Sequence, residues 1–238
     1  AVPLPIEITS TLYFLTSARI FASASSILFC GGVGKITAVS RTLRIVRIAV
    51  FVALIIVGAF VKFPIGIVPV SMQFAFCMFA SLMLGGLDSF ACVAIYIVMG
   101  LIGIPVFSAG GGFAYVLQPT FGYILGFLIA APVGGFVARG LKNDARLNVF
   151  RLLLGAFCSL AIVYAVGVFY MYLMLNYYVG TAMSMSKAWM AGCAVFLPTD
   201  CSWCVVGSLV TYAVLKRYNP RLTVKKGYES QPYVREID

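Results

Sequence analysis

The sequence predicts an all-α membrane protein, a bundle of six transmembrane helices with irregular external loops after the first and third helices. Hydrophobic residues make up 62% of the 238 residues and charged residues only 10%, whereas soluble domains contain about 25% charged residues. The mean hydropathy is +1.04. The apolar residues form long tracts separated by Gly, Pro and basic residues, which is the pattern of successive membrane spans.

The first three predicted helices are apolar tracts with clear ends. The first spans 48–61 and ends before a proline-containing stretch, 64–69. The second spans 73–84 and stops at a pair of glycines, and the third spans 90–101 and stops at Gly103. Because proline and paired glycines interrupt helices, the stretch after the first helix is predicted to be irregular.

An uncharged stretch, 107–120, separates the third helix from the fourth, which spans 121–137. Its glycines and proline oppose helix formation. An uncharged loop of this length is expected to fold back onto the bundle rather than lie in water. The fifth helix is predicted over 152–178. The sixth lies within 188–215, where Pro198 predicts a break or a kink.

Basic residues predict the orientation in the membrane. If the first helix starts in the cytoplasm, only Lys62 and Lys187 lie on the external face. The other predicted loops and ends then give the cytoplasm a large excess of positive charge, which is the usual bias of membrane proteins. Both irregular loops become external. The net charge of +10 therefore indicates membrane topology and contact with anionic lipid, not nucleic-acid binding, because no basic and aromatic face exists outside the apolar segments.

The chain is predicted to divide into three parts. Residues 1–40 form an N-terminal extension, which is either a further amphipathic or membrane segment or a targeting segment, since it is rich in serine and nearly free of acids. Residues 41–217 form the six-helix domain, with both of its ends in the cytoplasm. Residues 218–238 form a polar, basic tail.

Asp200 is the strongest candidate for a functional group. It alone among the seven carboxylate side chains lies in the middle of a long apolar tract. A charge at membrane depth costs roughly 2.5–3.5 kcal/mol on insertion scales and marks a functional site by default. The alternative is a carboxylate that neighbouring helices satisfy.

The sequence contains few candidate catalytic residues. An intramembrane aspartic protease needs a second carboxylate, and the chain has no histidine to act as a general base. No phosphate-binding loop of the ATPase type occurs. We therefore expect a binding protein with no catalytic residue, no cofactor and no metal.

Polar and aromatic side chains within or beside the apolar tracts supply the other binding candidates. Each has an alternative role in the interfacial belt or in the core. The candidates are Gln73, Thr120, Tyr96, Tyr115, Tyr123, Tyr164, Tyr170 and Asn176.

Two further patterns have both a structural and a functional interpretation. Ala49 and Ala53 are small residues four apart on the first helix, so they either pack within the bundle or dock another membrane subunit. Cys201 and Cys204 form a C-x-x-C pair, which allows an alternative function as a membrane thiol–disulfide protein. That alternative ranks low because an apolar helix disfavours the reactive thiolate.

The order and spacing of several stretches resemble those of a known family. They are Pro64-Ile-Gly66-Ile-Val-Pro69-Val-Ser-Met-Gln73, the glycines at 110–112, Pro119-Thr120-Phe-Gly122-Tyr123, Tyr164-Ala-Val-Gly167 and Phe196-Leu-Pro198-Thr-Asp200. From 48 to 215 the chain resembles the BioY-type biotin transporters, the substrate-binding S components of energy-coupling-factor (ECF) transporters.

The resemblance implies a six-helix bundle in the cytoplasmic membrane that binds biotin near the external face. Energy would come from a separate coupling membrane protein and two ATPases, with Ala49 and Ala53 docking the coupling protein. Asp200 would accept hydrogen bonds from the ureido ring, and Gly111, Thr120 and Tyr123 would belong to the region that closes the pocket.

The chain departs from the family pattern beside Asp200. The family has a glycine before this aspartate and a lysine three residues after it, where this chain has Thr199 and Trp203. Trp203 is therefore a candidate to stack on the bicyclic ring of biotin. The alternative functions are a weakened biotin pocket and a site for another small vitamin. The sequence leaves open whether the protein works alone, as a homo-oligomer, or only with ATPase partners.

Overall fold

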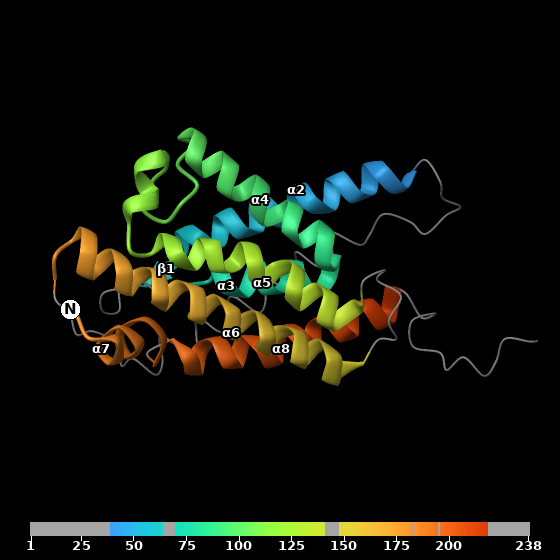
Figure 1. Ribbon diagram of the computed structural model, residues 1–238. Coiled ribbons are helices and arrows are strands. Elements are labelled where there is room, and N and C mark those ends of the chain that lie inside the picture. The colour runs from blue at the N-terminus through green and yellow to red at the C-terminus, as the bar shows by residue number, and fades with distance from the viewer. Residues whose placement is uncertain (1–38, 64–69, 141–147, 182, 195, 219–238) are drawn as a thin grey trace, which may run out of the picture.

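A computed structural model describes residues 39–63, 70–140, 148–181, 183–194 and 196–218 as a bundle of apolar helices (Figure 1). The predicted extension up to residue 38, the stretch 64–69 and the tail from residue 219 lie outside these ranges. Three of the described helices are long and apolar enough to cross a membrane, or up to four if the bent pair Met185–Ala194 and Leu197–Arg217 is counted as one span. Within these ranges the fold is all-helical apart from one two-residue strand pair.

The elements follow one another along the chain, with an irregular loop after α4 and a short strand pair after α2. They are α2 (Val39–Phe60), β1 (Lys62–Phe63), β2 (Val70–Ser71), α3 (Gln73–Leu84), α4 (Gly86–Ile102), the 3-10 turn η1 (Phe113–Leu117), α5 (Phe121–Arg139), α6 (Val149–Leu173), the π turn η2 (Met174–Tyr178), α7 (Met185–Trp189), the π turn η3 (Met190–Ala194) and α8 (Leu197–Tyr218). The strands pair antiparallel.

The predicted helix ends differ from the observed ones mainly at the N-terminal ends. The second predicted helix is confirmed as α3. The first begins at Val39 rather than at 48, because arginine is a good helix former and does not interrupt it. The third begins at Gly86 rather than at 90, with Asp88 in its first turn, where a carboxylate favours the helix dipole.

The last predicted span is bent by 43° between its two halves. Pro198 lies in the first turn of α8, after the bend. A proline is tolerated there because the backbone N–H that it lacks has no partner within the helix. The residue predicted to kink a continuous helix therefore begins a new one.

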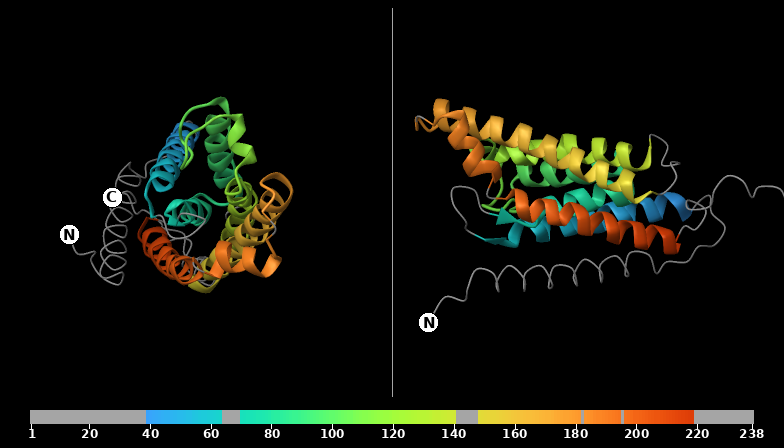
Figure 2. Two further views of the ribbon diagram at one scale, coloured as in Figure 1. Left: turned by 90° about the vertical axis from the view of Figure 1, so that its left-hand side faces the viewer. Right: turned by 90° about the horizontal axis from the view of Figure 1, so that it is seen from below.

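Helix α3 lies at the centre of the bundle. All twelve of its residues are buried, and Figure 2 shows it surrounded by the other helices when the bundle is viewed end-on. It packs against α2, α4, α5, α6 and α8. Because its side chains are apolar on every face apart from Gln73 and Ser81, it is suited to this central position.

Helices α5 and α6 form the most extensive helix pair. Small residues recur every four positions on the contacting face of α5, at Gly122, Gly126, Ala130 and Gly134. A Cβ atom on Gly126 would lie 3.0 Å from the Val163 Cα atom of α6. The two backbones therefore approach closely, as small residues permit in membrane bundles.

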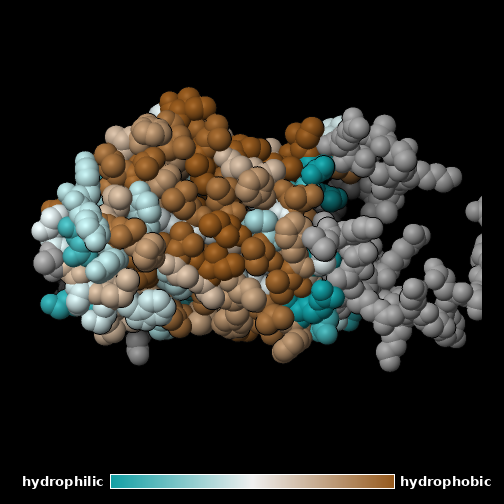
Figure 3. Space-filling view, in the orientation of Figure 1, coloured by the Kyte–Doolittle hydropathy of each residue, from teal (hydrophilic) through white to brown (hydrophobic). Residues whose placement is uncertain are grey.

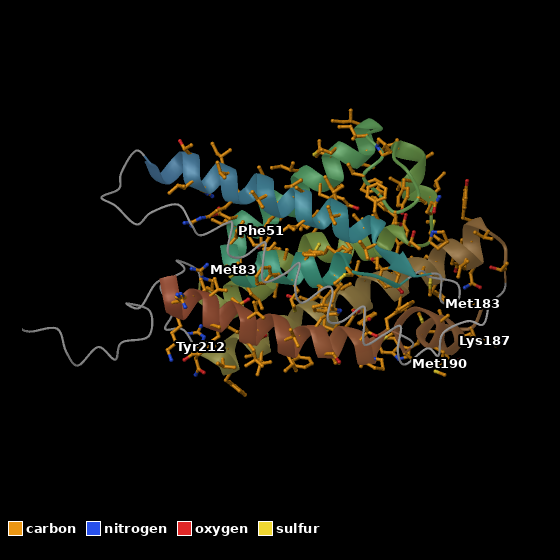
Figure 4. The ribbon with its side chains drawn as sticks, turned by 180° about the vertical axis from the view of Figure 1, so that it is seen from behind. Phe51, Met83, Met183, Lys187, Met190 and Tyr212 are labelled. Carbon is orange, nitrogen blue, oxygen red and sulfur yellow. The ribbon has the colours of Figure 1, made fainter. Side chains whose placement is uncertain are left out.

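The two ends of the bundle differ in charge. Arginine and lysine gather where α2 begins and α8 ends, and there Arg44 Nε donates to Asp88 Oδ1 at 2.7 Å, which joins α2 to α4. At the same end Arg139 donates to the Met83 carbonyl oxygen at the end of α3. Figure 4 shows Met83 and Tyr212 towards this end and Lys187 and Met190 at the opposite end.

The flank of the bundle is apolar. Figure 3 shows a hydrophobic band between more hydrophilic ends. Large exposed hydrophobic side chains include Leu87, Ile95 and Val98 on α4 and Leu154 on α6. Exposed apolar surface of this kind suits contact with lipid rather than with water.

Candidate ligand-binding site

A pocket lies at the end of the bundle away from the basic cluster. The space between its walls is about 680 Å³, including the part that is open to solvent. Its walls are mainly apolar and aromatic, with a few polar groups. The lining residues are Ser71, Gln73, Phe74, Ser108, Tyr115, Thr120, Tyr123, Ile124, Phe127, Val163, Tyr164, Phe196 and Asp200.

The pocket forms where the ends of several elements meet. The start of α3 brings Gln73, and the start of α8 brings Asp200. The first turns of α5 contribute Tyr123 and Phe127, which share one helix face because they are four residues apart. Helix α6 contributes Tyr164 two-thirds of the way along its length. The close packing of α5 on α6 sets the distance between these side chains.

Asp200 has a hydrogen-bond donor within the pocket. The Tyr164 hydroxyl donates to Asp200 Oδ2 at 2.5 Å. The carboxylate also lies in the first turn of α8, where the helix dipole favours negative charge. Within the described part of the chain, the ion pair found is Arg44 with Asp88 at the other end. Asp200 is therefore held by a neutral donor and retains acceptor capacity for a ligand.

Aromatic rings form the side walls. The rings of Tyr123 and Tyr164 meet edge to face, with centroids 6.5 Å apart and planes at 88°. Phe74 and Phe127 face each other at 6.5 Å. The Tyr123 hydroxyl donates to the Gly192 carbonyl oxygen at 2.8 Å, so this tyrosine presents its ring to the pocket. Such walls suit a flat, largely apolar ligand.

The loop between α4 and α5 packs over one side of the pocket. Phe107 anchors it, fully buried between Tyr96 and Tyr115. The hydroxyls of Ser108 and Tyr115 lie 3.0 Å apart and both residues line the pocket. Gly110 and Gly112 have φ angles of 118° and 102°, which favour glycine at these two turn positions.

Six of the predicted binding residues line this pocket, namely Gln73, Tyr115, Thr120, Tyr123, Tyr164 and Asp200. Their binding roles stay predictions. Gln73 is buried, and its Nε2 atom has no hydrogen-bond partner of normal geometry, although the side chain lies beside the Tyr96 hydroxyl.

Three further predicted residues, Tyr96, Gly111 and Trp203, lie outside the lining. Tyr96 is buried in the core, where its hydroxyl donates to the Val106 carbonyl oxygen at 3.3 Å. Gly111 is exposed in the loop. Trp203 is only 2% exposed, packed one turn further along α8 than Asp200. The stacking predicted for Trp203 therefore has no support in this arrangement.

Several other candidates have structural partners. The Asn176 amide nitrogen donates a hydrogen bond to the Met183 carbonyl oxygen, and its amide oxygen accepts one from the Met183 N–H. Asn176 therefore stabilises the connection from α6 to α7. Tyr170 donates to the Val116 carbonyl oxygen in the loop. Cys201 and Cys204 are free thiols, and Cys204 is fully buried. A buried thiol is poorly accessible to an exchange partner, which weighs against thiol–disulfide chemistry.

Sequence reasoning did not select most of the apolar lining. Phe74, Phe127, Val163 and Phe196 line the pocket, but similar residues occur throughout the chain. Helical spacing from Tyr123 was a usable signal for Phe127, which lies one turn later. Ser71 and Ser108 lie in irregular segments and carried no periodic signal.

Comparison with known proteins identifies the family of the chain. Residues 33–220 match the model of the BioY family. This chain belongs to the BioY family. It is 36% identical over 184 residues to a protein named probable biotin transporter BioY of Lysinibacillus sphaericus, covering 77% of this chain and 92% of that one. It is 34% identical over 174 residues to the biotin transporter BioY of Thermotoga maritima, covering 73% and 96%.

A solved structure supports the fold of this BioY-family chain. It is the S component for biotin from an ECF-type ABC transporter. It matches with a TM-score of 0.67 at 24% identity, over 76% of this chain and 95% of that one. The BioY-family chain therefore shares the helical fold of that structure.

Proposed function

We propose that this protein takes up biotin across the cytoplasmic membrane as the substrate-binding S component of an ECF transporter. The observation that carries the proposal is the pocket around Asp200, built from aromatic rings and a few polar groups, in a chain of the BioY family. The two relatives named above carry biotin in their names, and each aligns over more than 90% of its own length.

The chemistry of the pocket suits the ureido ring of biotin. That ring offers two N–H donors and one carbonyl acceptor. Asp200 is a carboxylate that accepts one bond from Tyr164 and has further lone pairs for the donors. Gln73 has a buried amide nitrogen that lacks a well-formed partner and can donate to the carbonyl. The aromatic walls would cover the apolar faces of the bicyclic ring.

In this proposal the chain crosses the membrane six times, through α2, α3, α4, α5, α6 and the broken span that ends in α8. The basic end faces the cytoplasm, following the positive-inside bias, and the pocket faces the exterior. A coupling membrane protein and ATPases supply the energy. Ala49 and Ala53 lie on the exposed side of α2, where a partner helix can approach closely.

Binding of radiolabelled biotin to the purified full-length protein in lipid nanodiscs tests the proposal. We expect saturable binding that unlabelled biotin displaces and that a hundredfold excess of thiamine or riboflavin leaves in place. Displacement by another vitamin, with no retention of biotin, would assign the pocket to that vitamin instead. The absence of any saturable biotin binding would refute the proposed function.

The position of Trp203 leads to a prediction about the residue where the family pattern has lysine. We expect Trp203→Lys to destabilise the protein without tightening biotin binding, because it buries an ammonium group in a packed helix face at a cost of roughly 2.5–3.5 kcal/mol. Thermal aggregation followed by size-exclusion chromatography measures the loss. Trp203→Phe, which keeps an aromatic ring and adds no charge at this buried position, is the matched control. Tighter binding by Trp203→Lys would place this position in the pocket.

A further inference from the structure

The broken last span is held on both sides of its break by tyrosines that line the pocket. Before the break, the Gly192 carbonyl oxygen of η3 accepts a hydrogen bond from the Tyr123 hydroxyl at 2.8 Å. After the break, Asp200 of α8 accepts one from the Tyr164 hydroxyl at 2.5 Å. The two tyrosine rings contact each other edge to face. One aromatic pair therefore connects both halves of the span to α5 and α6.

Two glycines leave room for the Tyr123 side chain and for its hydrogen bond to Gly192. A Cβ atom on Gly167 of α6 would overlap the Tyr123 ring, and a Cβ atom on Gly192 would overlap the Tyr123 hydroxyl. The same atom on Gly192 would lie 2.7 Å from the terminal methyl group of Met171. Only glycine at these two positions leaves room for the ring and for the close approach of its hydroxyl.

The Gly192 carbonyl oxygen belongs to the turn just before the break. Across the break, the Phe196 N–H donates a hydrogen bond to the Cys193 carbonyl oxygen. The Asp200 N–H then donates one to the Phe196 carbonyl oxygen. A carbonyl inside a membrane bundle must find a donor within the protein. The Tyr123 hydroxyl supplies one to Gly192 and thereby fixes where the first half of the span ends.

We propose that Tyr123 is a positioning residue, whose hydroxyl holds Gly192 and so places Asp200, across the break, for the ligand. This inference deepens the proposed function and rests on it for the choice of biotin as the probe. The Tyr123 ring lines the pocket, while its hydroxyl acts on the backbone of the last span. Loss of the hydroxyl should therefore loosen the break even without ligand.

Tyr123→Phe tests the role, since it keeps the ring and removes the hydroxyl. In the ligand-free protein we expect faster hydrogen–deuterium exchange in peptides that cover 192–200. We also expect biotin affinity to fall by about three- to tenfold, the usual effect of one neutral hydrogen bond. Tyr170→Phe is the matched control, because it loses a tyrosine bond to a backbone carbonyl away from the break. Its exchange over 192–200 should stay unchanged.

A compensating pair tests whether Tyr123 and Gly192 act through one contact. Gly192→Ala puts a methyl group where the Tyr123 hydroxyl lies and should reproduce the effects of Tyr123→Phe. In the double variant the missing hydroxyl leaves space for that methyl once the flexible end of Met171 shifts, so its exchange and affinity should match those of Tyr123→Phe alone. Additive losses would instead mean that the two substitutions disturb separate contacts, which would overturn the joint role of Tyr123 and Gly192.

The outcomes distinguish this inference from the proposed function. If the unsubstituted protein binds no biotin, the proposed function fails and the exchange of the ligand-free variants still decides the inference. Unchanged exchange over 192–200 in Tyr123→Phe overturns it, whatever happens to affinity. A fall in affinity with unchanged exchange would instead mean that the hydroxyl contacts biotin directly.

Discussion

Replacing Asp200 with alanine should reduce biotin affinity by a hundredfold or more while leaving a folded protein. A hydrogen bond to a charged group contributes about 1.5–3 kcal/mol, and a pocket carboxylate that accepts two ureido donors would lose both bonds. The substitution also leaves the Tyr164 hydroxyl without its acceptor in a largely buried site. Equilibrium binding of radiolabelled biotin to protein in nanodiscs measures the effect.

Two controls define what the Asp200 result means. Asp88→Asn removes the carboxylate at the opposite end of the bundle, where it pairs with Arg44, and should leave biotin affinity unchanged. Asp200→Asn keeps the size of the side chain and an oxygen for Tyr164, so it should retain stability and still lose most of the affinity. Full binding by Asp200→Ala would mean that the carboxylate has only a structural role.

The sequence was sufficient to predict the class of fold and the element that carries Asp200. Long apolar tracts interrupted by Gly and Pro define most helices, because helices satisfy their own backbone hydrogen bonds in lipid. The break near Pro198 was also predictable, although its position was not. Proline is disfavoured inside a helix but accepted in its first turn, so Pro198 alone does not say on which side the bend lies.

The partners of Asp200 were much harder to predict. The sequence showed that the family's lysine beside Asp200 is replaced by Trp203, but it did not indicate that Tyr164, 36 residues earlier, donates to the carboxylate. That contact depends on how α6 lies against α8, which no local pattern encodes. Tyr96 and Tyr123 have the same residue type, but one is buried in the core and the other lines the pocket.

The stripe of small residues on α5 was a readable signal of a close helix contact. Gly122, Gly126 and Gly134 repeat at multiples of four residues, which indicates a tight interface as clearly as Ala49 and Ala53 do on α2. Its partner helix could not be named from this pattern. The geometry shows that α6 fills the role, and that this contact places Tyr123 beside Tyr164.

Replacing Gly155 with leucine should therefore prevent most of the protein from folding. A Cβ atom at this position of α6 would lie 2.6 Å from the Gly134 carbonyl oxygen and 3.0 Å from the Ala138 Cβ atom. The backbone carbonyl of Gly134 cannot rotate away as a flexible side chain can, so α5 and α6 must separate. Overpacking of a core typically costs about 1–3 kcal/mol even where side chains adjust, and here the obstacle is the backbone.

The yield of monodisperse protein in size-exclusion chromatography, together with its thermal stability in detergent, measures this loss. Gly155→Ala should give an intermediate loss, because it adds only the first clashing atom. Ala161→Leu introduces leucine at an exposed position of the same helix and should leave yield, stability and biotin affinity unchanged. A Gly155→Leu protein that folds and binds biotin normally would show that close contact of α5 with α6 does not define the pocket. Because Tyr123 and Tyr164 come from these two helices, any fraction that still folds should bind biotin more weakly.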